Sequence, residues 1–296
     1  MTSPMDIYLS HFGLRERPFS LLPDPDFLFW SKSHVRAFSM LEYGIVTRAP
    51  ITLITGEVGA GKTTLLRHLL NTLDADLCVG LISNAHGDRG ELLRWVLQAL
   101  DQTADPQATY VELFGQFEQF LIAEYAAGRR VVLIFDEAQN LSRESLEELR
   151  MFTNINAGKD ELLQLVLVGQ PELRDMVRQP GLSQFAQRVG SNFHLPRLDA
   201  DMVRDYVDRR LAVAGATEQI FTSAAIEIIH AATGGVPRLI NQLCDLSLLY
   251  ASTDDQHKVT GATVQAVLDD NVFFGSGAET SQDVPGATSF QAYQGK

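Results

Sequence analysis

The sequence lacks long apolar runs, and it has only two cysteines in 296 residues. No apolar segment approaches the roughly 18 residues that a transmembrane helix needs, so we expect no direct membrane span. Cys78 falls in an expected strand and Cys244 on an apolar helical face, which indicates two buried thiols rather than a disulfide or a metal site. Residues 1–19 show no positive region followed by a hydrophobic stretch. We therefore expect no secretory signal and a cytoplasmic location.

Basic residues are also scarce. The chain has 24 Lys and Arg residues against 37 Asp and Glu residues, a net charge of −13. A negative net charge does not favour binding to nucleic acid, which is itself negatively charged, and only a local basic patch would allow such a partner. The seven histidines show no metal-ligand spacing, and His68, His194 and His230 are interpreted as ordinary fold residues. Hydrophobic residues make up 45% of the chain, enough for a globular main domain and a smaller one.

A glycine-rich motif, GEVGAGKT at residues 56–63, is the most specific signal present. It follows an apolar stretch at residues 51–54 and precedes a helical pattern at residues 64–70, as a phosphate-binding loop between a strand and a helix requires. Its glycines allow positive φ angles and a close approach of the backbone to phosphate oxygens. Lys62 can reach the β- and γ-phosphates, and Thr63 can place its hydroxyl on Mg²⁺. The expected ATP contacts are Gly56, Glu57, Val58, Gly59, Ala60, Gly61, Lys62, Thr63 and Thr64.

Two carboxylates follow a second apolar run, residues 131–135. The run predicts a strand buried on both faces, so Asp136 and Glu137 should emerge at the carboxyl edge of a parallel sheet, where ligands of open α/β folds bind. Asp136 suits holding Mg²⁺, directly or through water, and Glu137 suits polarising the water that attacks a γ-phosphate. Such a pair is weak evidence alone, because acidic residues commonly start loops. Together with the upstream phosphate loop it predicts a hydrolase.

A further strand is predicted at residues 162–168, after a helix that Ser142 opens and that ends near residues 156–158. The strand places Gln170 on the same sheet edge as the carboxylates, where it can sense the γ-phosphate or orient water. The alternative is a polar residue that simply begins a loop. Arg188 lies in the last turn of the next helix, before a short strand at residues 191–195.

From residue 199 onward the sequence predicts helices without strands. Asp199, Thr222 and Thr260 read as N-caps, and Pro237 begins a helix after a Gly-Gly-Val turn. Arg238 therefore falls in the first turn of a helix, where the helix dipole disfavours a cation unless an anion such as phosphate compensates it. The alternative is a surface arginine paired with a nearby carboxylate. Residues 275–296 are rich in Gly, Ser and Gln and are expected to be disordered.

The order GEVGAGKT, VLIFDEAQNL, LVLVGQPEL, QRV and GGVPRLIN closely resembles AAA+ ATPases of the general secretion pathway protein A type, which also occur with pilus and exopolysaccharide export systems. The resemblance spans about residues 8–273 and includes the N-terminal segment, which contributes to the adenine pocket in that family. It implies that Gln170 is sensor 1, Arg188 a trans-acting arginine finger and Arg238 sensor 2. An intramolecular salt bridge is the alternative for Arg188.

The sequence thus predicts a P-loop NTPase of the AAA+ type, with a helix-flanked parallel sheet at residues 1–198, a small helical lid at 199–274 and a tail at 275–296. The resemblance implies an ATP- and Mg²⁺-dependent ATPase that forms a homo-oligomer such as a hexamer and drives or regulates assembly of an envelope secretion, pilus or exopolysaccharide export system. Its place would be the cytoplasm, peripheral to the inner membrane through a partner. We do not expect the transmembrane helix and cell-wall-binding domain with which members of this type typically continue. The alternative function is an ATP-dependent, DNA-associated adaptor similar to transposition helper ATPases.

Overall fold

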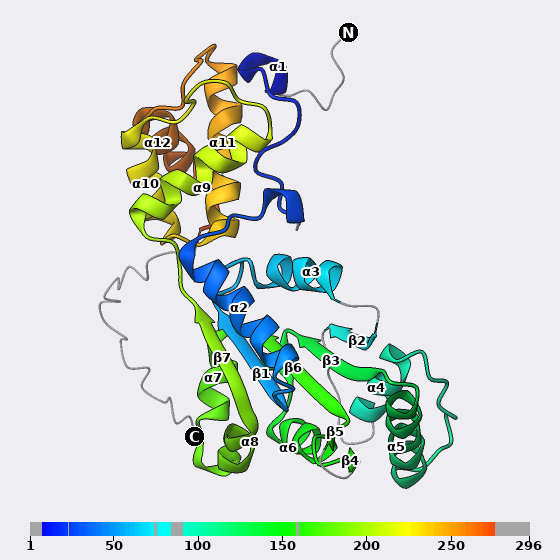
Figure 1. Ribbon diagram of the computed structural model, residues 1–296. Coiled ribbons are helices and arrows are strands. Elements are labelled where there is room, and N and C mark those ends of the chain that lie inside the picture. Colours follow the sequence, from blue (N-terminus) through cyan, green and yellow to red (C-terminus); the bar gives the residue numbers. More distant parts are fainter. Residues whose placement is uncertain (1–7, 23, 74–75, 84–90, 158–159, 276–296) are drawn as a thin grey trace, which may run out of the picture.

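The computed structural model describes residues 8–22, 24–73, 76–83, 91–157 and 160–275. A five-stranded parallel sheet forms the centre, and helices cover both of its faces (Figure 1). The strand order is β2-β3-β6-β1-β7. The strands are β1 (Ile51–Gly56), β2 (Leu77–Ser83), β3 (Arg130–Asp136), β6 (Leu163–Gly169) and β7 (Val189–Leu195).

The strand register aligns the ends of the three central strands. Leu167 of β6 pairs with Leu53 of β1 on one side and with Phe135 of β3 on the other. The segments that follow these strands therefore leave the sheet at one common edge, as parallel pairing requires. β1, β3 and β6 are buried almost throughout, which explains why their sequences are continuous apolar runs rather than alternating ones.

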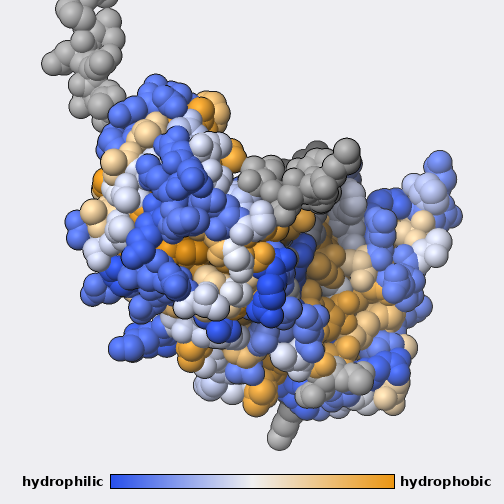
Figure 2. All heavy atoms as spheres, turned by 90° about the horizontal axis from the view of Figure 1, so that it is seen from above, coloured by the Kyte–Doolittle hydropathy of each residue, from blue (hydrophilic) through white to orange (hydrophobic). Residues whose placement is uncertain are grey.

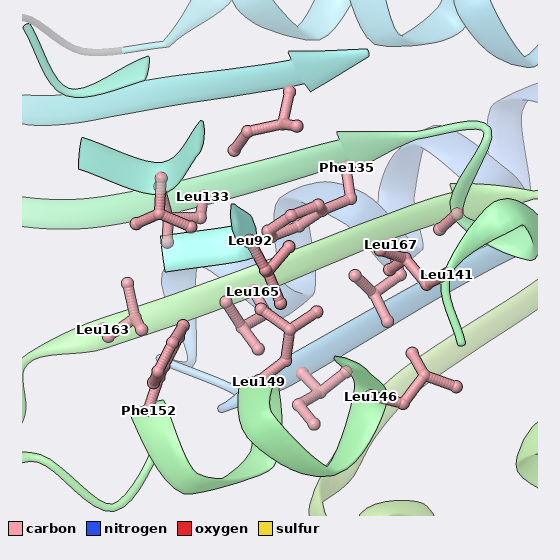
Figure 3. Close-up of a cluster of buried hydrophobic side chains, with 14 of the residues drawn as sticks. Leu92, Leu133, Phe135, Leu141, Leu146, Leu149, Phe152, Leu163, Leu165 and Leu167 are labelled. Carbon is pink, nitrogen blue, oxygen red and sulfur yellow. The ribbon is translucent and has the colours of Figure 1, made fainter. Parts of the chain in front are cut away.

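Alternate residues of the central strands face two different helical layers. Leu133 and Phe135 join a buried cluster with the first layer, whereas Val132 and Ile134 join a cluster with the second. Figure 3 shows the first cluster, in which Leu149 and Phe152 lie against strand leucines. The first layer comprises α4 (Glu91–Ala99), α5 (Tyr110–Ala126), α6 (Arg143–Phe152), α7 (Pro171–Val177) and α8 (Ser183–Arg188). The second comprises α2 (Lys32–Val46) and α3 (Lys62–Thr72).

One helix ends earlier than its sequence predicts. Ser142 caps α6 as expected, accepting a hydrogen bond from the Ser145 N–H at 3.0 Å, but α6 ends at Phe152. The next residues form β4 (Asn156–Ala157), which pairs with β5 (Asp160–Glu161) in a two-stranded antiparallel ladder. Pairing across this hairpin replaces continuation of the helix. The described residues also include three short 3-10 helices, η1 (Pro25–Phe27), η2 (Ala138–Asn140) and η3 (Pro180–Leu182).

The helical lid is a separate lobe beyond one end of the sheet (Figure 1). It consists of α9 (Ala200–Val213), α10 (Ser223–Thr233), α11 (Pro237–Thr253) and α12 (Gly261–Asp269). Asp199, Thr222 and Thr260 each accept a hydrogen bond from the backbone N–H three residues later, so these three predicted N-caps are confirmed. No helix within the described ranges is long and apolar enough to cross a membrane.

The N-terminal segment packs with the lid, although we expected it to belong with the sheet. After α1 (Leu9–Phe12), its buried side chains Leu14, Phe19 and Phe27 share one cluster with the lid helices, and the Phe19 and Phe221 rings lie 5.9 Å apart, edge to face. A division at residue 198 stays a prediction. The predicted tail falls outside the described residues apart from Gly275.

Candidate nucleotide-binding site

The phosphate loop connects β1 to α3, and two of its glycines have backbone angles that suit only glycine. Gly59 has φ 75° and Gly61 has φ 96°, both in the left-handed region. Lys62 folds back over the loop, where its Nζ donates to the carbonyls of Gly56 at 2.7 Å and Glu57 at 2.9 Å. Burial lowers the pKa of Lys62, while the Glu137 and Asp136 carboxylates oppose that shift. The loop thus holds a buried cation beside the backbone N–H groups that begin α3.

Thr63 and Asp136 meet at the start of this helix. The Thr63 hydroxyl donates to Oδ2 of Asp136 at 3.1 Å. This hydrogen bond links the first turn of α3 to the last residue of β3. Burial raises the pKa of Asp136, against hydrogen bonds from the Glu137 N–H and from Thr63. A hydroxyl and a carboxylate are hard oxygen ligands of the kind that Mg²⁺ prefers. The donor set fits that ion.

Glu137 is held in a strained conformation directly after β3. Its φ is 56°, in the left-handed region that a residue with a side chain rarely adopts. Its Oε2 accepts hydrogen bonds from the side-chain amides of Gln139 at 2.7 Å and Gln170 at 3.3 Å. The Gln170 N–H in turn donates to Oε1 of Gln139 at 3.0 Å. Gln139 is not among the predicted site residues, although it lies in the same motif, two residues after Glu137.

Arg238 touches the loop from the lid side. Its N–H donates to the Gly59 carbonyl at 3.3 Å, and a Cβ added to Gly59 would lie 2.4 Å from the Cβ of Arg238. Within the described ranges no carboxylate lies within 4.0 Å of the guanidinium. The arginine is therefore close to the phosphate loop and carries no ion pair there.

A pocket runs from the phosphate loop to the lid and the N-terminal segment. One end is formed by the loop and Glu137. The other end presents apolar and aromatic side chains, which suit the faces of a nucleobase. The apolar and aromatic residues among the lining are Leu21, Leu22, Phe27, Leu28, Phe29 and Tyr206, and the polar Arg210 and Asn241 lie with them. Figure 2 shows hydrophobic surface beside the lid, interspersed with polar residues.

His34 is a second residue that the sequence analysis missed. Its Nε2 lies 3.3 Å from the Ala60 carbonyl, and its Nδ1 lies 2.8 Å from the Ser31 hydroxyl. The ring is buried, which lowers its pKa. His34 is 26 residues away from Ala60 along the chain, so no local pattern signalled this contact.

Arg188 lies far from the other predicted site residues of its own chain. It precedes Val189, which pairs with Ile51 at the start of β1, whereas the phosphate loop follows the end of β1. Its guanidinium contacts Glu161 at 3.9 Å, the Thr153 carbonyl at 3.4 Å and the Asn154 side chain. The fold brings Lys62, Thr63, Asp136, Glu137, Gln170 and Arg238 together but leaves Arg188 at the opposite end of the sheet.

The fold is that of a P-loop NTPase with an AAA-type core, and a family model described as "AAA domain" matches residues 46–177, somewhat less than half of the chain. The chain is 42% identical over 253 residues to general secretion pathway protein A of Aeromonas hydrophila, which confirms the predicted resemblance. The aligned region covers 86% of this chain and 46% of that protein, so the chain spans about half the length of this relative.

Two solved structures share the fold at low sequence identity. Cdc6p of Pyrobaculum aerophilum is 17% identical with a TM-score of 0.66, and the match covers 86% of this chain and 72% of that one. The ORC2 protein of Aeropyrum pernix is 15% identical with a TM-score of 0.59, over 81% and 67% of the two chains. At these identities the likeness shows the fold alone.

Proposed function

We propose that this protein binds ATP and hydrolyses it to ADP and phosphate with Mg²⁺. The observation that carries the proposal is the convergence of a buried lysine, a hydroxyl–carboxylate pair and a strained glutamate around one glycine loop. Residues 56–64 would hold the phosphates, and Thr63 and Asp136 would hold Mg²⁺. The ion, when bound, neutralises charge on the β- and γ-phosphate oxygens.

The remaining residues suit the hydrolytic step. Glu137 would accept a proton from the water that attacks the γ-phosphorus, and the Gln139 and Gln170 amides would fix the direction of its carboxylate. Arg238 would contact the γ-phosphate from the lid. Arg188 is too far from its own phosphate loop to act there, so any part it takes requires a neighbouring subunit.

We further propose a homo-oligomer, such as a hexamer, that drives or regulates assembly of an envelope secretion, pilus or exopolysaccharide export system. The name of the Aeromonas relative supports a secretion role. We propose a cytoplasmic location, peripheral to the inner membrane through a partner. The DNA-associated adaptor stays the alternative, and the net charge of −13 disfavours it.

Phosphate release from ATP by the full chain tests the proposal. Omission of Mg²⁺ should abolish turnover, and Lys62→Ala should weaken ATP binding by about 10- to 100-fold because a charge-assisted phosphate contact is lost. Lys258→Ala, at an exposed lid position, is the matched control. Unchanged ATP affinity of Lys62→Ala by calorimetry would contradict the assignment. Strong stimulation by duplex DNA would favour the adaptor.

A further inference from the structure

Arg210 on α9 is a buried cation at the base end of the pocket, 6% exposed. Its Nε donates to the Pro18 carbonyl at 2.5 Å, and its Nη2 lies 3.5 Å from the Ser20 carbonyl. Its Nη1 donates to the Tyr206 hydroxyl at 3.0 Å. The guanidinium also lies over the Phe27 ring, 4.8 Å from its centroid. The guanidinium thus contacts the N-terminal segment through Pro18, Ser20 and Phe27, and its own helix through Tyr206.

This arrangement differs from an ordinary buried ion pair. Among the residues that the structure describes, no carboxylate lies within 4.0 Å of Arg210. Burial of an unpaired cation is costly, and here carbonyl dipoles and aromatic rings compensate it. A neutral residue would avoid that cost, so the guanidinium is best explained by what its planar fork of donors fixes in place.

A second set of contacts fixes the same stretch of main chain. The Asn241 side-chain amide on α11 donates to the Ser20 carbonyl at 3.3 Å, and the Tyr206 hydroxyl donates to Oδ1 of Asn241 at 2.7 Å. All three side chains are buried. Two lid helices therefore hold Pro18 and Ser20 through a continuous hydrogen-bonded network.

The segment that this network fixes continues directly into the pocket wall. Ser20, Leu21 and Leu22 line the pocket, as do Phe27 to Phe29, whereas the phosphate loop lines its other end. Leu21 and Leu22 are 52% and 79% exposed, so packing of their own side chains contributes little to hold them. The contacts from Arg210 and Asn241 tie residues 18–20, directly before Leu21 and Leu22, to the lid helices.

We propose that Arg210 is a positioning residue, which clamps residues 18–20 to the lid and thereby sets the wall that receives the nucleoside part of ATP. The inference rests on the proposed ATP-binding function. The phosphates bind at the loop, through Lys62 and backbone groups that do not touch Arg210. Loss of the clamp should therefore weaken recognition of the nucleoside while phosphate binding persists.

Calorimetry with two probes, Mg-ATP and Mg-tripolyphosphate, separates these contributions in the full-length chain. Arg210→Gln should weaken ATP binding by about 10- to 100-fold, the effect of losing a charged hydrogen-bond network, and leave tripolyphosphate affinity unchanged. Asn241→Ala removes only one of the contacts to Ser20 and should give a smaller loss for ATP alone. It also serves if Arg210→Gln fails to fold. Arg209→Gln, at the adjacent exposed position, is the matched control and should bind both probes like the parent.

The outcomes are distinct. Equal losses for both probes in Arg210→Gln, or no loss for either, would overturn the positioning role, and so would an Asn241→Ala variant that loses both equally. If the parent protein bound neither probe, the proposed nucleotide-binding function itself would fail, independently of Arg210.

Discussion

The main-chain N–H of Arg238 donates a hydrogen bond to the carbonyl of Gly59, 3.3 Å away, so the first turn of α11 rests on the phosphate loop. This is a main-chain contact, and beside it the Glu57 carboxylate of the loop pairs with Arg197, which lies just before α9, at 3.1 Å. The main-chain contact requires glycine at position 59, because a Cβ there would lie 2.4 Å from the Cβ of Arg238. Any nucleotide that orders the loop should therefore also affect the lid.

Arg238→Ala should weaken the ATP-dependent approach of lid and core with little effect on the fold. The reason is that the guanidinium, which has no carboxylate within 4.0 Å among the described residues, is free to meet the γ-phosphate. Small-angle scattering with and without a non-hydrolysable ATP analogue measures the compaction. Arg209→Ala is the lid control. The same ligand-induced compaction in parent and Arg238→Ala would favour an ordinary surface arginine.

Glu137→Gln should retain ATP binding and lose hydrolysis by roughly 10²–10⁴-fold, since the amide preserves shape but cannot accept the proton. Steady-state phosphate release and ATP affinity give the two readouts. Glu144→Gln, on the exposed first turn of α6, is the control. Turnover at the parent rate would mean that another residue positions the water. A Glu137→Gln protein that holds ATP is also suited to capture of a partner.

Arg188 should matter only between subunits, because it lies at the end of the sheet opposite its own phosphate loop. If it serves a neighbour's nucleotide, specific activity should rise with protein concentration, and Arg188→Ala should lower turnover by about 10³–10⁵-fold without weakening ATP binding. Mixing inactive Arg188→Ala with inactive Glu137→Gln should then restore some activity. If specific activity did not change with protein concentration and the mixture stayed inactive, Arg188 would not act between subunits. Its role would then be limited to the intramolecular contacts with Glu161 and Asn154.

Stability should decline in mild acid, in part because of His34. Burial holds the pKa of His34 below its ordinary value of 6.5. Below about pH 6.5 the His34 side chain of the unfolded chain is protonated, whereas the buried ring of the folded protein stays neutral. The free energy of unfolding therefore decreases as the pH falls below about 6.5. His34→Gln should reduce this loss, measured by urea unfolding at about pH 7.5 and about pH 5.5. His257→Gln, at an exposed position, is the control. An unchanged pH dependence in His34→Gln would assign the loss to other groups.

The sequence by itself determined the strand–loop–helix unit around Lys62, the strand that ends in Asp136 and the three lid N-caps. These features depend on neighbouring residues: a run of apolar side chains, glycines at set spacing, or a side-chain oxygen (a carboxylate at Asp199, a hydroxyl at Thr222 and Thr260) three residues before a free N–H. Their structure follows locally, so a single sequence suffices to predict them. The predicted end of α6 is wrong by several residues, because the β4–β5 ladder that follows Phe152 has only two paired residues on each side and leaves no clear pattern in the sequence.

Only the tertiary structure decided which distant residues meet the loop. His34 reaches Ala60 across 26 positions, Arg210 reaches Pro18 across 192, and the N-terminal segment packs with the lid rather than with the sheet. Gln139 was overlooked although it lies within the acidic motif, since its role depends on the turn that brings Gln170 beside it. Such contacts arise when separate elements bury their apolar faces against one another, and the alternation of residues along each element does not specify which partner it will meet.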